Sequence, residues 1–399
     1  MFRPTRILQA VLIALTTAGC AATPSSVAPS QPKADQTALA PSTAPQRSPG
    51  IVAIKSLAEP ASISAGESRS GRTLFFSATG QLNADIAAYA RDVSHTRQIP
   101  LDVVTALLMQ AEYNATAVKL MRPTTGRIKR SWVTYKQRNV DPVRIRRGVA
   151  FWQTHRTDLD RISQAYGVPQ SVIVAILGVE TVYGKIMGDF KVLDALFTLG
   201  FAYPDDSRPE RGQLFRDQLA DLIQLHHEGE LDARIVQGSF AGAMGMPQFM
   251  PGSLIRYAVD GNGDGRIDLR NNPVDAMASI ANFLRAHGWE PGLPVFAPAR
   301  LSAANKTMVD GGIYPKRSWT ELQQAGAAVQ GKTGHTGPWQ QASLGVVNLV
   351  DEPRNTTEYR LGTPNFFAIT HYNRSYFYAS SVADLASELA SQMGYANPN

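Results

Sequence analysis

Residues 172–179 form an almost wholly apolar segment that follows Pro169 and precedes Gly184. Proline is common where a helix starts, and glycine is common just after its last turn, so we expect a helix over residues 170–183. A helix that is apolar all round must be buried, because it has no face to present to water. The chain of 399 residues, 44% apolar and 18% charged, is long enough for roughly two or three packed units around such a helix.

One carboxylate, Glu180, stands at the end of this apolar segment. Burial disfavours the charged form of a carboxyl group, and the last helical turn lies at the negative end of the helix dipole. Both effects raise the pKa and favour a protonated side chain near neutral pH, which a general acid for glycosidic cleavage requires. A salt-bridged glutamate that closes the helix is the alternative, and spacing alone leaves both interpretations open.

Helical patterns also lie on both sides of the apolar segment. Apolar residues recur at helical spacing from residue 82, over 101–120, from Pro142 to Gly167, around 215–222 and from Pro273 onwards. Beyond Trp289 the sequence predicts β-prone runs at 344–350, 358–361 and 366–370, followed by a final helix at 382–393. The fold class is therefore α+β, mainly α-helical, with a small β-containing C-terminal part.

The N-terminus carries a secretory signal. Basic residues precede an apolar stretch, residues 7–15, and small residues then lead to Cys20. This single cysteine cannot form an internal disulfide, and Ala-Gly-Cys resembles a bacterial lipobox, in which the cysteine is acylated. Thr17 departs from that motif, which usually has leucine there, and an ordinary signal with a chance cysteine is the alternative. With a lipid on Cys20, Ala21 favours sorting to the outer membrane, and residues 21–80 have the composition of a disordered tether.

Residues 238–251 are dense in glycine, alanine and methionine, unlike a regular helix. Such a composition indicates a tight backbone that a ligand can approach closely. Ser239 and Gln248 could present hydrogen bonds to the hydroxyl and amide groups of a sugar. A glycine-rich packing loop is the alternative, and it is common for such a composition.

A calcium loop of the EF-hand type is indicated just after this segment. Its first oxygen ligands are Asp260, Asn262 and Asp264. Gly265 stands at the sixth position, and Arg266 at the seventh would supply its backbone carbonyl. The usual acidic residue at the twelfth position is replaced by Asn271, so Asp275 or Asp268 must close the loop. Asp275 has a second interpretation, because a carboxylate is also favoured at a helix N-terminus.

Glu180, the 238–251 segment and the EF-hand-like loop follow one another in an order that resembles the membrane-bound lytic murein transglycosylase B family, glycoside hydrolase family 103. The resemblance runs from about residue 82 to the C-terminus and is densest over 166–289. It implies a lysozyme-like core with Glu180 as the sole catalytic residue, and structural calcium at the loop. It also implies a glycan cleft lined by Tyr135, Ser239, Gln248, Phe249, Tyr372, Asn373 and Tyr378.

The sequence departs from the family pattern in two features. Asp205 and Asp206 stand where the family has a pair of arginines, so contacts to peptide-stem carboxylates are expected to differ. Phe283 stands where a cleft tyrosine is expected, which removes one hydroxyl.

The resemblance implies a lytic transglycosylase that cleaves the β-1,4 bond between N-acetylmuramic acid and N-acetylglucosamine and leaves 1,6-anhydromuramic acid ends on peptidoglycan. Ordinary glycosidases need two carboxylates, whereas this sequence offers one convincing candidate. A hydrolytic muramidase on the same core and a non-catalytic, calcium-stabilised peptidoglycan-binding lipoprotein are the alternatives. The net charge of +6 is too small to indicate nucleic-acid binding. We expect a monomer, lipid-anchored at the periplasmic face of the bacterial outer membrane.

These interpretations divide the chain along its length. The predicted parts are a signal peptide (1–20), a tether (21–80), a helical domain (81–165), a lysozyme-like catalytic core with the EF-hand-like loop (166–290) and a β-containing C-terminal region with a final helix (291–399).

Overall fold

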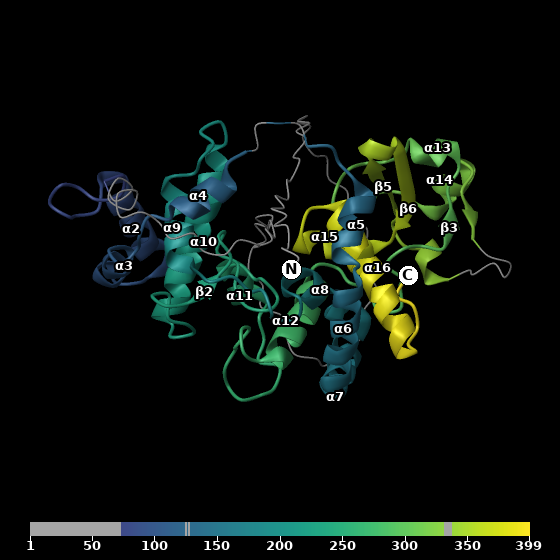
Figure 1. The fold of residues 1–399 in the computed structure, drawn as a ribbon, viewed down its shortest axis with the longest axis horizontal. Helices are drawn as coiled ribbons and strands as arrows, with labels where there is room; N and C mark the ends of the chain where they lie inside the picture. Colours follow the sequence, from purple (N-terminus) through teal and green to yellow (C-terminus); the bar gives the residue numbers. More distant parts are fainter. Residues whose placement is uncertain (1–72, 124–125, 127, 331–336) are drawn as a thin grey trace, which may run out of the picture. The chain divides into compact units, whose positions relative to one another are not determined.

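The computed structural model describes residues 73–123, 126, 128–330 and 337–399. All of them belong to one compact unit, Gly50–Asn399. The signal peptide, Cys20 and the predicted tether before residue 73 lie outside the described residues. Helices dominate the described chain and its strands are short, which confirms the predicted α+β, mainly helical class (Figure 1).

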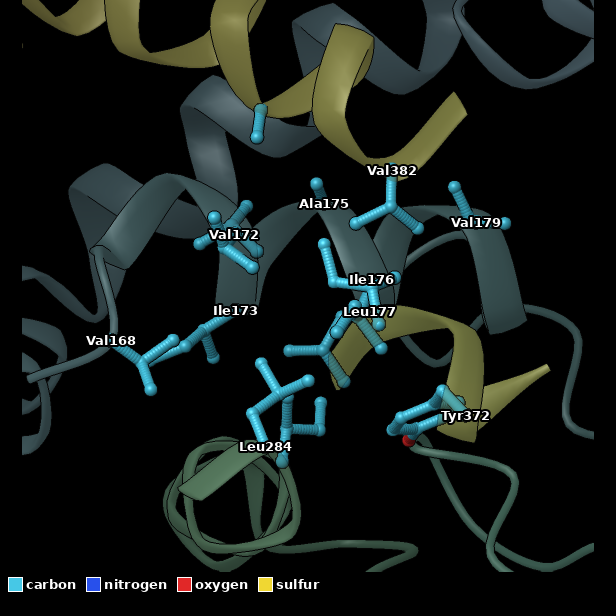
Figure 2. Close-up of a cluster of buried hydrophobic side chains, with 14 of the residues drawn as sticks. Val168, Val172, Ile173, Ala175, Ile176, Leu177, Val179, Leu284, Tyr372 and Val382 are labelled. Carbon is cyan, nitrogen blue, oxygen red and sulfur yellow. The ribbon is translucent and has the colours of Figure 1, made fainter. Parts of the chain in front are cut away.

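The core is built around helix α8 (Gln170–Thr181), in which every residue from Ser171 to Val179 is buried. Four helices contact it, and they are α6 (Pro142–Thr154), α7 (Arg156–Tyr166), α12 (Pro273–Ala286) and α16 (Tyr376–Met393). Figure 2 shows side chains of α8 beside Leu284 of α12, Tyr372 of α15 and Val382 of α16. The segment predicted to be buried on all its faces is thus the centre of the main hydrophobic cluster.

A second hydrophobic cluster combines early and middle parts of the chain. It is formed by the helices α2 (Ala84–Arg97), α3 (Leu101–Leu108), α9 (Val192–Phe201) and α10 (Pro209–His227). The rings of Phe75 and Phe197, far apart in sequence, meet edge to face with centroids 4.6 Å apart. Helix α4 (Ala115–Met121) packs on α9 from another side. The helices before residue 122 are therefore held by helices that follow α8.

In the described part of the chain, the strands form three two-stranded antiparallel sheets. The longest pair, β5 (Gly345–Asp351) and β6 (Thr356–Gly362), aligns Gly345 with Gly362 and Asp351 with Thr356. It confirms both β-prone runs at 344–350 and 358–361. The short pairs are β1 (Phe190–Lys191) with β2 (Gln237–Gly238) and β3 (Ala299–Arg300) with β4 (Ala328–Val329). The remaining elements are α5 (Trp132–Asn139), α11 (Pro251–Tyr257), α13 (Ala303–Lys306), α14 (Trp319–Gln324), α15 (Pro364–Tyr372) and the 3₁₀ turns Pro338–Gln340 and Glu352–Arg354.

Two predicted helices are interrupted. The single helix expected over 101–120 is wrong, because α3 ends at Leu108 and α4 starts only after Asn114, whose side chain accepts the Ala117 N–H at 2.9 Å. The pattern expected to run from Pro142 to Gly167 is also two helices, α6 and α7. They meet at His155, whose backbone leaves the helical region with φ −109° and ψ 23°.

The prediction of a β-prone run at 366–370 is wrong, because these residues lie within helix α15. Thr363 caps this helix by accepting the Asn365 N–H at 3.1 Å, and Pro364 takes the first helical position. These start signals outweigh the β-propensity of the aromatic residues, which are buried on the helix instead.

Among the described residues, no single helix is long and apolar enough to cross a membrane. Helices α7 and α8 taken together are long and apolar enough by length and composition only, and they are bent by 112° at their junction.

Candidate active site

Glu180 lies in the last turn of α8, one residue before the helix ends at Thr181. The predicted end at Gly184 is wrong, because Val182 and Tyr183 already have left-handed backbone conformations, with φ of 51° and 60°. Their N–H groups bond back to carbonyl groups of the helix at 3.2 and 3.1 Å, as in a helix that closes on itself. A β-branched residue is strained in this region, so the surrounding packing must hold the turn.

Two side chains fix this helix end. Thr181 is fully buried, donates its hydroxyl to the Met246 carbonyl at 2.9 Å and accepts the Gly184 N–H at 3.0 Å. Arg144 of α6 donates from Nε to the carbonyl of Gly178 at 3.0 Å. Sequence reasoning missed both residues. Thr181 could have been found, because a hydroxyl at the end of a buried helix must have a partner.

Tyrosines from three other helices face Glu180, whose Oε1 atom is buried. Tyr135 belongs to α5, Tyr372 ends α15 and Tyr378 lies in the first turn of α16. Burial raises the pKa of each phenol, and the negative charge of Glu180 raises each of these pKa values further. The three hydroxyls therefore stay protonated at neutral pH and can act as donors. We call Tyr135, Tyr372 and Tyr378 the tyrosine cluster.

Ser239 and Gln248, both predicted to line the cleft, are used within the 238–251 segment itself. Ser239 is 0% exposed, and its hydroxyl accepts the Ala243 N–H at 3.0 Å. Gln248 donates its side-chain amide to the carbonyl groups of Met187 at 3.2 Å and Gly245 at 3.0 Å. Both side chains shape the backbone beside Glu180, since this segment also supplies the Met246 carbonyl bound by Thr181.

Phe249 and Phe283 continue the tyrosine cluster into the core. The ring centroid of Phe249 lies 5.9 Å from that of Tyr372 and 5.7 Å from that of Phe283. Phe283 is 1% exposed, so the missing hydroxyl at this position leaves a ring that packs among other rings. Asn373, the last predicted cleft residue, is half-buried directly after α15.

The loop 260–268 folds around its own carboxylates. Asp260 accepts backbone N–H groups from two loop glycines, both at 2.7 Å, and these bonds hold its pKa below the usual value. Asp275 is 0% exposed and accepts the N–H groups of Gly261 at 2.9 Å and Asp268 at 2.8 Å. The Asp275 carboxylate therefore reaches back from α12 to both ends of the loop.

The other predicted ligands lie in the same turn. Asn262 donates its amide to Asp264 at 2.8 Å, and Asp264 also accepts the Arg266 N–H at 2.9 Å. Within the described ranges, no three His, Cys, Asp or Glu side chains are arranged to hold a metal ion. The available donors are nevertheless carboxylate, amide and carbonyl oxygens, which is the set that calcium prefers. The chemistry of the loop fits calcium, while its carboxylates are turned towards backbone N–H groups.

Comparison with known proteins gives consistent results. Residues 81–387 match the family model described as "Transglycosylase SLT domain". The chain is 39% identical over 283 residues to the membrane-bound lytic murein transglycosylase B of Escherichia coli strain K12, covering 71% of this chain and 73% of that protein.

Solved structures agree with the sequence match. The chain resembles the lytic transglycosylase SltB1 of Pseudomonas aeruginosa, with a TM-score of 0.69, 34% identity, and coverage of 78% of this chain and 98% of the other. It also resembles the Escherichia coli lytic transglycosylase SLT35 solved in complex with calcium, with a TM-score of 0.65, 34% identity, and coverage of 78% and 94%. The chain therefore belongs to the membrane-bound lytic murein transglycosylase B family of transglycosylase SLT domains.

Proposed function

We propose that this chain is a peptidoglycan lytic transglycosylase in which Glu180 acts as both acid and base. The position of Glu180 carries the assignment: it stands at a strained helix end, with three phenols, two of them buried, within reach of its charge. Low-dielectric surroundings favour a protonated carboxyl group, and the phenols can donate to it once it has lost its proton. The murein named in the relative's description is the substrate that we assign to the site.

The reaction needs one carboxyl group. Glu180 gives its proton to the oxygen between C1 of N-acetylmuramic acid and C4 of N-acetylglucosamine, and the C1–O4 bond breaks. The 6-hydroxyl of the same muramic acid then bonds to C1, and Glu180 takes the proton of that hydroxyl. The glutamic acid is restored, no water is consumed, and the product is a 1,6-anhydro end. Hydrolytic glycosidases need a second carboxylate to act as a nucleophile or to activate water.

The next carboxylates in sequence are less suited to this role. Asp194 accepts the Glu112 N–H at 2.9 Å and pairs with Lys191 at 3.1 Å, both through Oδ1, so this carboxylate has partners elsewhere. Asp189 is exposed, and water stabilises the charged form of an exposed carboxylate.

Mass spectrometry of purified murein digested by the protein tests this proposal. We expect fragments that end in 1,6-anhydromuramic acid. Reducing muramic acid ends would instead identify a hydrolytic muramidase, and intact murein would identify a non-catalytic wall-binding protein. Either of these results overturns the proposal.

We also propose that the 260–268 loop, together with Asp275 of α12, binds structural calcium. Asp260, Asn262, Asp264, the Arg266 carbonyl and Asp275 would supply the ligands. Support comes from the buried Asp275 carboxylate, which contacts both ends of the loop, and from the related SLT35 structure in complex with calcium. The ion would tie the loop to α12, which packs against α8.

Cys20 is proposed to carry a lipid that anchors the protein at the periplasmic face of the outer membrane. The sequence pattern and the membrane-bound relative support this location. Residues 21–72 would then act as a tether, because Phe75 and Phe76, near the end of the predicted tether, are buried in the folded unit. The rest of the domain division given above stays a prediction, as does the monomeric state. Cys20→Ala should move the protein from the membrane fraction to the soluble fraction while its activity on murein is kept. A wild-type protein without lipid at Cys20 would show that the anchor is absent.

A further inference from the structure

A row of aromatic rings leads away from the tyrosine cluster. The ring centroids of Tyr372 and Phe283 are 4.8 Å apart, and Phe283 stacks on His287 at 4.0 Å. The His287 ring lies 4.9 Å from that of His371, which lies 5.2 Å from the ring of Tyr314. We call Phe283, His287, His371 and Tyr314 the aromatic row.

The aromatic row runs from the core to the surface. Phe283 is 1% exposed, whereas Tyr314 at the other end is 59% exposed, and the two histidines between them are half-buried. Among the exposed large apolar side chains of the described residues, Tyr314 is the only aromatic one. An exposed ring that continues a buried aromatic cluster offers a face on which a ligand can stack.

The loop that carries Tyr314 is held on both sides. On one side, Tyr376 donates its hydroxyl to the Gly312 carbonyl at 2.7 Å. On the other, Arg317 exchanges backbone hydrogen bonds with Leu344 at 2.8 and 2.7 Å. Tyr376 is the first residue of α16, the helix that also supplies Tyr378 of the tyrosine cluster. Tyr314 is therefore fixed relative to the active site, which reduces the entropy lost when a ligand binds.

Two cationic side chains flank the aromatic row. Burial, followed by the charges of His287 and Arg374, lowers the pKa of His371, and Arg374 itself is exposed. Arg256 is exposed too, and it lowers the pKa of His287, on which burial has the largest effect. The imidazole rings are therefore neutral at neutral pH, while positive charge stands beside them. Neutral rings with neighbouring cations suit a ligand that has apolar C–H faces and a carboxylate.

We propose that Tyr314 and His371 form an outer glycan subsite, which binds a sugar ring of the strand beyond the sugars that flank the cleaved bond. The sugar would stack its C–H face on Tyr314, and Arg374 would pair with the carboxylate of an N-acetylmuramic acid unit. This inference rests on the proposed function, because it takes the same strand as its ligand. The continuous contact from Tyr314 to the tyrosine cluster is the reason to assign a glycan rather than a separate partner.

The subsite predicts that affinity depends on strand length. Binding is measured by calorimetry with peptide-free murein glycan strands, either long or cut to tetrasaccharides, in a Glu180→Gln background that does not cleave them. Adding Tyr314→Ala should weaken binding of long strands roughly three- to tenfold, the usual effect of a lost aromatic contact, and leave tetrasaccharide binding unchanged. Tyr314→Phe is the matched control, because it keeps the ring and should bind like the parent.

Other outcomes overturn the subsite. Equal weakening for both strand lengths would mean that Tyr314 binds the sugars next to the cleaved bond or only stabilises the fold. Unchanged binding of long strands would mean that Tyr314 does not contact the glycan. Arg374→Gln should weaken binding of long murein strands but not of chitin oligomers of equal length, which lack the carboxylate. Equal effects on both polymers would refute the ion pair. Two other results would instead contradict the proposed function: residual cleavage by Glu180→Gln, or murein that the wild-type protein leaves intact.

Discussion

In the proposed reaction, the carboxyl group of Glu180 gives a proton and later takes one back, and this requirement can be tested with a single atom exchange. Glu180→Gln keeps the size of the side chain but cannot transfer a proton. Loss of general acid–base help costs about 10²- to 10⁴-fold in rate, and we expect the upper end because one residue has both roles. The variant should stay folded, since the amide keeps the size and hydrogen-bonding shape of the carboxyl group.

The measurement is the release of anhydro-muropeptides from murein, together with a melting curve. Asp189→Asn is the control, because it also neutralises a carboxylate but on an exposed residue. Nearly wild-type release by Glu180→Gln would contradict the assignment of Glu180 and would indicate that another carboxylate transfers the proton.

His371 gives a prediction for stability against pH. Burial, followed by His287 and Arg374, lowers its pKa in the folded protein from 6.5 to about 4. The unfolded chain therefore binds a proton more readily than the folded one between these values, and stability is lost as pH falls through this window. His371→Gln removes this site, so its melting temperature should fall less between pH 7 and pH 4.5 than that of the wild type.

The control for His371 is the exposed His227, at the end of α10. His227→Gln should leave the pH dependence as it is in the wild type. His287 also has a lowered pKa, so part of the decrease should persist in His371→Gln. A pH profile of His371→Gln identical to that of the wild type would contradict the assignment.

At the scale of the element, the end of α8 positions Glu180 through Thr181. Thr181→Val keeps the shape of the side chain but leaves the Met246 carbonyl and the Gly184 N–H without this hydroxyl. Unsatisfied buried groups cost about 1–3 kcal/mol, so urea unfolding should show a loss of this size. We also expect a lower kcat, because the helix end that carries Glu180 is held less firmly. Thr181→Ser, which keeps the hydroxyl, should recover most of the kcat; equal kcat values for both variants would exclude the positioning role.

The same element shows what sequence can predict. The apolar run of α8 requires burial whatever surrounds it, so its existence and its central place were predictable. Its end was not, because Val182 and Tyr183 adopt left-handed conformations that only their surroundings can stabilise. The interruption after Leu108 and the helix over 364–372 depended on single capping residues, Asn114 and Thr363, which outweighed the local apolar pattern.

At the scale of the whole molecule, the tyrosine cluster comes from three helices that are far apart in sequence. No periodicity links Tyr135 to Tyr372 or Tyr378, and only the family resemblance suggested them together. The family resemblance did not suggest the residues of the aromatic row together. Two of its members lie near positions that the family resemblance had named, with His371 before Tyr372 and His287 one turn after Phe283. The contact between the two histidines forms only when α12 and α15 pack together, so the sequence did not predict it.

Calcium should stabilise the whole molecule, because a ligand that binds only the folded state shifts the unfolding equilibrium. We expect calcium to raise the melting temperature of the wild type and to have no effect on Asp264→Ala. Asp206→Ala, at an exposed carboxylate outside the loop, should respond like the wild type. Equal melting curves of the wild type with calcium and with a chelator would show that the loop binds no structural calcium.

Helix α16 contacts α8 and supplies Tyr378, although it comprises residues Tyr376–Met393, near the end of the chain. Helix α16 follows α8 in the chain, so a growing chain contains Glu180 before it contains Tyr378. A chain cut before Tyr376 therefore keeps Glu180 but lacks one of the phenols that its charge affects.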